Sequence, residues 1–124
     1  MKYVDGFVLV VSKKRVKAYQ KMAQMAGKVW KKHGALAYFE CMGDDLNPDM
    51  CGMKALMFPK MAKLKKGETV WFSFIMYKSR KHRDLVNAKV MKDPLMNAND
   101  WKDKPMPFDM KRFAYAGFRA IVEA

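Results

Sequence analysis

Hydrophobic positions divide the chain into short segments with two different periods. Four segments are rich in β-branched and aromatic residues, which is typical of strands: residues 3–11, 36–42, 69–77 and 111–122. Between the first two, residues 16–33 place apolar side chains three and four positions apart, which predicts a helix. A shorter stripe, which includes His82, Val86 and Val90, predicts a second helix that ends near residue 90.

Turn and capping residues support these boundaries. Ser12 and Ser79 stand where the N-caps of the two helices are expected. Gly34 follows the first helix and suits the left-handed conformation that often ends one, while Pro94 ends the second helix. Residues 46–67 and 95–109 have no regular period, and we expect them to be irregular.

The order of the elements is strand, helix, strand, strand, helix, strand. Adjacent strands and right-handed crossovers then give a four-stranded antiparallel sheet with both helices on one face. The sequence therefore predicts an α+β protein with the ferredoxin-like βαββαβ fold, formed by one domain over residues 1–124.

Two helices cover only one face of such a sheet, so the other face should alternate apolar and polar residues if it meets water. The segment 69–77 does not alternate in this way. Val70, Phe72 and Phe74 point to one side, while Trp71 and Ile75 point to the other. Monomers rarely expose a large apolar face. We therefore expect a second copy, another partner, a ligand or stacked bases to cover the open face.

Four blocks of the chain resemble the YbaA-like family of uncharacterised bacterial proteins. The blocks are YVDGFV at 3–8, ECMGDD at 40–45, SRKHRDLVNAKVM at 79–91 and MPFDMKR at 106–112. The resemblance spans essentially the whole chain and implies a dimeric α/β barrel, in which two ferredoxin-like protomers press their open sheet faces together. It implies no established reaction and no cofactor.

The charge balance points to an alternative function. Lys and Arg number 25 against 12 Asp and Glu, for a formal net charge of +13. Lys17, Lys21, Lys28 and Lys31 recur opposite the apolar stripe of the first helix. A non-catalytic module that binds nucleic acid or another anionic partner is therefore the alternative to a small-ligand protein.

Other features limit the setting in which the protein acts. No apolar run approaches the roughly 20 residues of a membrane span. Two cysteines make no disulfide framework, and residues 1–11 do not resemble a signal peptide. We expect a cytoplasmic protein with reduced thiols. Asp44 and Asp45, and Cys41 and Cys51 among several methionines, have no metal-ligand spacing, so we expect no metal and no cofactor.

Polar residues inside the predicted strands are the candidates for a site. Asp5, Glu40, Ser73 and Arg119 each lie within a strand, and polar groups in a covered sheet need partners or a ligand. His82 lies on an apolar helix stripe and can act as a base near neutral pH. The candidate catalytic residues are Asp5, Glu40 and His82, and the candidate ligand-binding residues are Tyr38, Trp71, Ser73 and Arg119.

If this prediction holds, at least two of the three catalytic candidates line one cavity. Mutual pairing of these polar groups is the structural alternative. The sequence thus predicts a homodimer with a small-ligand pocket between the sheet and the helices. It names no substrate, and it leaves open whether the protein catalyses a reaction.

Overall fold

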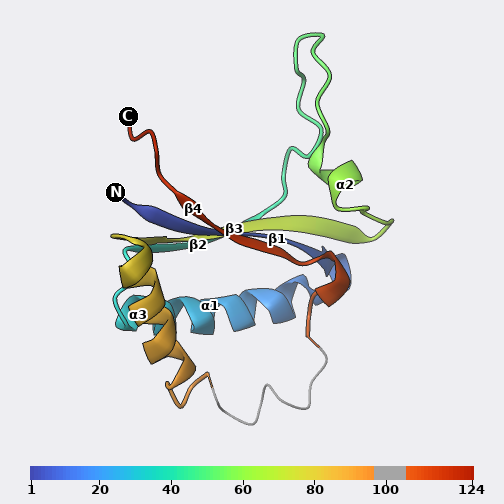
Figure 1. Ribbon diagram of the computed structural model, residues 1–124. Coiled ribbons are helices and arrows are strands. Elements are labelled where there is room, and N and C mark those ends of the chain that lie inside the picture. The colour runs from blue at the N-terminus through green and yellow to red at the C-terminus, as the bar shows by residue number, and fades with distance from the viewer. Residues whose placement is uncertain (97–105) are drawn as a thin grey trace.

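The computed structural model describes residues 1–96 and 106–124. The strands are β1 (Tyr3–Ser12), β2 (Ala37–Met42), β3 (Glu68–Tyr77) and β4 (Ala114–Arg119). The helices are α1 (Val16–Lys32), the single-turn α2 (Phe58–Met61) and α3 (Arg80–Met91). The strands form an antiparallel sheet in the order β2-β3-β1-β4, with α1 and α3 on one face (Figure 1). This arrangement confirms the ferredoxin-like fold.

The pairing of β1 with β3 decides which side chains face the helices. The two strands pair over their full length, from Tyr3 opposite Tyr77 to Ser12 opposite Glu68. Because side chains alternate along a strand, odd-numbered residues of both strands face the helices and even-numbered ones face away. Leu9, Val11 and Trp71 pack with residues of α1, and Ile75 packs with residues of both helices.

The structure confirms two of the predicted residues at helix ends, Ser79 and Gly34, but not Ser12. The Ser79 Oγ accepts a hydrogen bond from the His82 N–H at 3.1 Å and caps α3. Gly34 has φ +112° after the end of α1, as predicted. Ser12 makes no capping hydrogen bond, because a 3₁₀ turn at Lys13–Arg15 separates it from α1.

The last strand is shorter than the predicted segment 111–122. A 3₁₀ turn at Met110–Arg112 takes up its first residues. The Asp109 carboxylate accepts hydrogen bonds from the Lys111 N–H and the Arg112 Nε, and the Arg112 guanidinium binds both oxygens of Glu68. These contacts fix the chain beside the start of β3, so that pairing with β1 begins only at Ala114.

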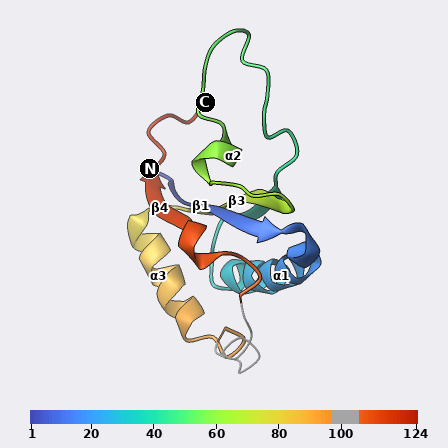
Figure 2. The same cartoon turned by 90° about the vertical axis from the view of Figure 1, so that its right-hand side faces the viewer.

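The segment between β2 and β3 lies on the face of the sheet opposite α1 and α3 (Figures 1 and 2). Its inner part folds back on the sheet, where Ala62, Leu46 and Leu64 pack around Val10 and Val70. It includes α2, which the sequence pattern did not predict. The same chain therefore covers one end of the open face.

No other described residues cover the rest of the open face. Phe39, Phe72 and Phe118 are 52%, 43% and 57% exposed, and the rings of Phe39 and Phe74 stack at 5.0 Å. This exposed aromatic surface agrees with the sequence of β3, in which apolar and polar residues do not alternate.

No helix among the described residues is both long and apolar enough to cross a bilayer.

An ion pair just after the C-terminal ends of α1 and α3 should make the stability of the protein depend on pH. Asp93 is buried, with Oδ2 2.7 Å from His33 Nε2 and 3.2 Å from Lys32 Nζ. The hydrogen bond with His33, the Leu95 N–H and the Lys32 ammonium lower the pKa of Asp93 from 3.8 to about 2.

Because the folded-state pKa lies below the unfolded value, this stabilisation is present above pH 3.8 and is lost as the pH falls toward 2. We expect Asp93→Asn to melt below the parent protein at pH 6, with a difference that shrinks as the pH approaches 2. Thermal melts over this range check it. A difference that does not change with pH would contradict the role given to Asp93.

Candidate functional site

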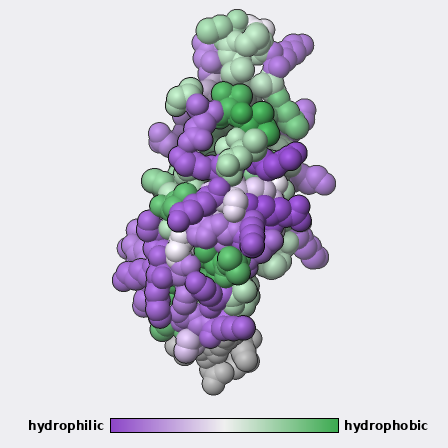
Figure 3. All heavy atoms as spheres, turned by 60° about the vertical axis from the view of Figure 1, so that its left-hand side comes forward, coloured by the Kyte–Doolittle hydropathy of each residue, from purple (hydrophilic) through white to green (hydrophobic). Residues whose placement is uncertain are grey.

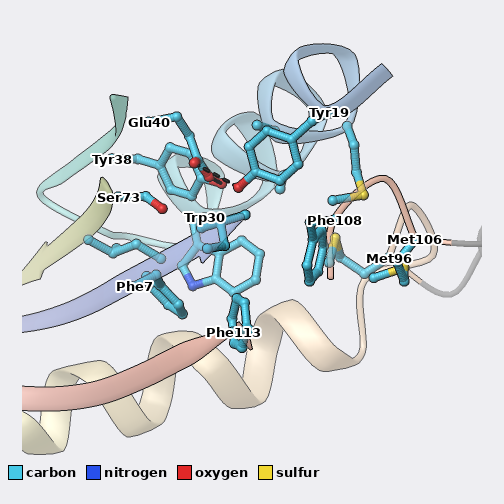
Figure 4. Close-up of a pocket in the computed structure, with 15 residues that line it drawn as sticks. Phe7, Tyr19, Trp30, Tyr38, Glu40, Ser73, Met96, Met106, Phe108 and Phe113 are labelled. Carbon is cyan, nitrogen blue, oxygen red and sulfur yellow. Dashed lines mark hydrogen bonds between the residues drawn. The ribbon is translucent and has the colours of Figure 1, made fainter. Parts of the chain in front are cut away.

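A cavity of about 370 Å³ lies between the helix-facing side of the sheet and α1 (Figure 4). Its wall is mainly aromatic and aliphatic, with Phe7 from β1, Trp30 from α1 and Phe108 and Phe113 from the segment before β4. Met96 and Met106 also line it. Such a wall favours an apolar ligand, and polar groups within it fix the ligand's orientation.

The main polar feature of this cavity is the Glu40 carboxylate on β2. The Tyr19 hydroxyl donates a hydrogen bond to Oε2 and the Tyr38 hydroxyl donates one to Oε1, each at 2.8 Å (Figure 4). Tyr19 comes from α1 and Tyr38 from β2, so the carboxylate joins the helix to the edge of the sheet. A carboxylate has further acceptor positions, which a ligand can use.

The two phenols remain hydrogen-bond donors at physiological pH. Burial and then the charge of Glu40 raise the pKa of Tyr19 and of Tyr38 far above the usual value of 10. A hydrogen bond with Ser73 acts against the shift at Tyr19. Ser73, Tyr19 and Glu40 therefore form a chain of hydroxyl and carboxylate groups along the cavity wall.

A second, more polar groove of about 470 Å³ lies between α1 and β2. Gln20 and Gln24 line it on the helix side, and it shares Tyr38 and Glu40 with the cavity. Trp71 lines it too, and the buried Trp71 Nε1 has no hydrogen-bond partner among the described residues. An unpaired buried donor costs about 1–3 kcal/mol of stability.

A glycine lets the helix approach this part of the sheet. A Cβ on Gly27 would lie 2.9 Å from the Tyr38 ring, which is closer than side chains tolerate. The absence of a side chain at this position therefore allows α1 to pack on Tyr38 while its hydroxyl reaches Glu40.

Three of the residues predicted from the sequence meet in the cavity. Glu40, Tyr38 and Ser73 all line it, and Glu40 pairs with Ser73 across β2 and β3. Trp71 lies in the adjoining groove and contacts Tyr19 edge-on at 4.8 Å.

Asp5 has a different environment. It is buried, and its Oδ1 lies 2.7 Å from Arg83 Nη1 in an ion pair between β1 and α3. Burial raises the pKa of Asp5, while the Arg83 charge and a hydrogen bond with Tyr115 oppose that rise. Arg83 also lies over the Tyr3 ring at 5.0 Å. Asp5 does not line the cavity that holds Glu40.

His82 and Arg119 also lie outside the cavity. The His82 Nδ1 accepts a hydrogen bond from the Lys78 N–H at 2.9 Å, and its ring contacts Tyr77, so it belongs to the start of α3. Arg119 is exposed at the end of β4. The expectation that two of Asp5, Glu40 and His82 share one cavity is therefore wrong, because paired partners hold Asp5 and His82 elsewhere.

The sequence interpretation missed Tyr19 and Trp30. Both lie on the apolar stripe of α1 and were not among the candidate site residues. A buried tyrosine hydroxyl or indole N–H needs a partner, and that requirement is the signal that was available. Trp30 satisfies it through Asn87 Oδ1 at 3.1 Å.

Metal ligands are not gathered in the part of the chain that the structure describes. No group of three or more His, Cys, Asp or Glu residues there is placed to hold an ion. Cys41 and Cys51 are free and exposed.

Comparisons with known proteins place the chain among uncharacterised relatives. The family model described as "Protein of unknown function (DUF1428)" matches residues 2–110. The uncharacterized protein YbaA of Escherichia coli K12 is 42% identical over 123 residues, with 99% of each chain covered, and YbaA of Shigella flexneri matches equally. The solved structure of Rv0793 from Mycobacterium tuberculosis covers 100% of this chain and 99% of its own, with a TM-score of 0.57 and 11% identity. That last likeness concerns the fold alone.

Proposed function

The chain belongs to the DUF1428 family of proteins of unknown function, and we propose that it is a cytoplasmic homodimer that binds a small, largely apolar molecule beside Glu40. The ligand lies in the cavity between the sheet and α1, with its apolar body against Phe7, Trp30 and Phe108.

The hydrogen-bonded carboxylate in this apolar wall is the observation that carries the proposal. Removing a carboxylate from water costs free energy, and a charged group that serves only stability is often replaceable by a packed apolar one. Glu40 accepts hydrogen bonds from Tyr19 and Tyr38 and borders both hollows. Its position fits a group kept for a ligand.

The chemistry of these groups defines the ligand class. Both Glu40 carboxylate oxygens accept hydrogen bonds in the structure, so the ligand offers this group a donor such as a hydroxyl. An acceptor on the same molecule, extended toward the groove, meets the side-chain amides of Gln20 and Gln24 that line it. The same carboxylate is a general base within reach of the bound hydroxyl, so proton abstraction is the reaction class that this site supports.

Two features support the assembly and the compartment. The uncovered aromatic surface formed by Phe39, Phe72 and Phe118 is the face that a second copy would cover. The free, exposed thiols of Cys41 and Cys51 fit a reducing compartment.

The alternative function, binding of nucleic acid or another anionic partner, rests on the positive charge of α1. Lys17, Lys21, Lys28 and Lys31 are exposed on α1 in a chain of net charge +13. Binding of an anionic polymer there would weaken steeply with salt. A titration with a mixed-sequence duplex at two salt concentrations separates this alternative from binding in the cavity, which we expect to vary little with salt.

A matched pair of probes tests the site. p-Cresol and p-xylene share a shape but differ by a hydroxyl that can donate to Glu40. Because a hydrogen bond to a charged group contributes about 1.5–3 kcal/mol, we expect the protein to bind p-cresol at least about tenfold more tightly in calorimetric titrations. Glu40→Gln should reduce that preference severalfold.

Glu123→Gln is the control, because Glu123 is exposed and pairs with Lys2 away from the cavity. It should keep the parent preference. Equal affinities for the two probes in the parent protein, or the same preference in Glu40→Gln, would contradict the role of the carboxylate.

A further inference from the structure

The segment that projects from the open face has a charge opposite to that of the rest of the protein. We call residues 43–57 the arm. It contains Asp44, Asp45 and Asp49 against the single Lys54, for a net charge of −2, whereas the rest of the chain carries +15. All four of these side chains are exposed. The arm therefore has the charge that fits the body of another copy of this chain.

The arm also carries apolar side chains that its own protomer does not cover. Met53 and Leu56 are 69% and 64% exposed. A side chain added at Gly52 would meet nothing within 4 Å, so the end of the arm stands clear of the body. In Figure 3 the upper part of the molecule, which includes the arm, shows apolar side chains between hydrophilic ones.

The end of the arm is nevertheless a defined turn. The Asp49 carboxylate accepts a hydrogen bond from the Cys51 N–H at 2.9 Å, and the Met53 N–H donates to the Met50 carbonyl at 3.1 Å. Cys51 and Gly52 both have positive φ, at 54° and 87°. A turn held in this way presents Met53 and Leu56 with less ordering cost on binding than a free coil would.

The direction of the arm decides what it can reach. It leaves the sheet on the side that exposes Phe39, Phe72 and Phe118, and the C-terminal residues rise on the same side (Figures 1 and 2). A second copy that covers this face would then lie beside the arm.

We propose that the arm is an intersubunit clasp, which lies against the body of a second copy and places Met53 and Leu56 in contact with it. This inference rests on the homodimer of the proposed function and adds the element that holds it. In a two-fold pair the contact occurs twice, so a modest contribution from each arm is doubled. The acidic side chains of the arm face the basic partner and orient the encounter.

Sedimentation equilibrium of an arm variant tests the clasp. Met53→Ser/Leu56→Ser should leave the monomer folded, because neither side chain is buried, and should weaken dimerisation by at least about tenfold. Leu85→Ser/Met110→Ser is the control, since both residues are exposed apolar side chains outside the arm. The control should change the dimer dissociation constant by less than about twofold.

The sedimentation results distinguish a failure of the clasp from a failure of the homodimer itself. A monomeric parent protein would overturn the homodimer and the clasp together. A dimeric parent whose dissociation constant is unchanged in Met53→Ser/Leu56→Ser would overturn the clasp alone and assign the arm to some other partner. Charge reversal by Asp44→Lys/Asp45→Lys should also weaken the dimer, and circular dichroism of each variant checks that the fold is intact.

Discussion

Replacing Arg83 with methionine should destabilise the protein by about 3–5 kcal/mol, the range observed when one partner of a buried ion pair is removed. The Arg83 Nη1 lies 2.7 Å from Asp5 Oδ1, and the side chains of Asp5 and Arg83 are only 2% and 13% exposed. Without the guanidinium, the Asp5 carboxylate stays buried without its cation. Urea denaturation at pH 7 measures the loss.

The direction in which pH changes the stability of Arg83→Met identifies the cause of its destabilisation. Burial already raises the pKa of Asp5 in the folded protein, and removing Arg83 takes away the charge that lowers it. A folded-state pKa above the unfolded value means that stability is lost as the pH rises through it. Relative to the parent, Arg83→Met should therefore regain stability as the pH falls from 7 toward 4.

A double variant separates a structural pair from a site. Asp5→Asn/Arg83→Met should recover much of the stability, because no charge is then left buried. Both variants should keep the p-cresol preference, since Asp5 lies outside the cavity. A loss below about 1 kcal/mol in Arg83→Met, or a lost preference in the folded double variant, would contradict the structural role of the pair.

If the protein is the homodimer that we propose, placing aspartate at Phe72 should yield a folded monomer. Phe72 points away from the helices and is 43% exposed, so in a monomer the new carboxylate would lie in water. At a covered interface it would be buried without a partner, at a cost of several kcal/mol. We expect dimerisation to weaken at least about a hundredfold in sedimentation equilibrium.

The neighbouring position is the matched contrast. Trp71 faces α1 and is buried in the core, so Trp71→Asp should prevent folding. If Phe72→Asp instead sediments as the parent dimer does, the open face is not the interface. If it unfolds as Trp71→Asp does, that face is already part of the monomer core.

Local signals in the sequence predicted most of the fold. The switch between strand and helix periods and the residues Ser79, Gly34 and Pro94 place the elements within a few positions. α2 could not be predicted, because Ala62 and Leu64, which follow it, owe their positions to packing on Val10, far away in the chain. The start of the fourth strand depended likewise on the contact of Arg112 with Glu68.

Only those site residues whose positions follow from the alternation of side chains along a strand could be predicted from the sequence. Tyr38 and Glu40 lie two residues apart on β2 and so face the same side, and Ser73 lies opposite Glu40 on β3. Asp5 has the same orientation as this group, but Arg83, 78 residues further along the chain, pairs with it. No local sequence pattern reveals such a distant partner. The sequence therefore could not distinguish a carboxylate held in an ion pair from one that faces a ligand.

A crystal structure of the protein soaked in p-cresol tests the central claim most directly, namely that the cavity beside Glu40 is the ligand site. We predict the cresol ring among Phe7, Trp30 and Phe108, with its hydroxyl oxygen at hydrogen-bond distance, about 2.5–3.0 Å, from a Glu40 carboxylate oxygen. Cresol bound only on the open face beside Phe39 and Phe72, with the cavity empty, would contradict the claim.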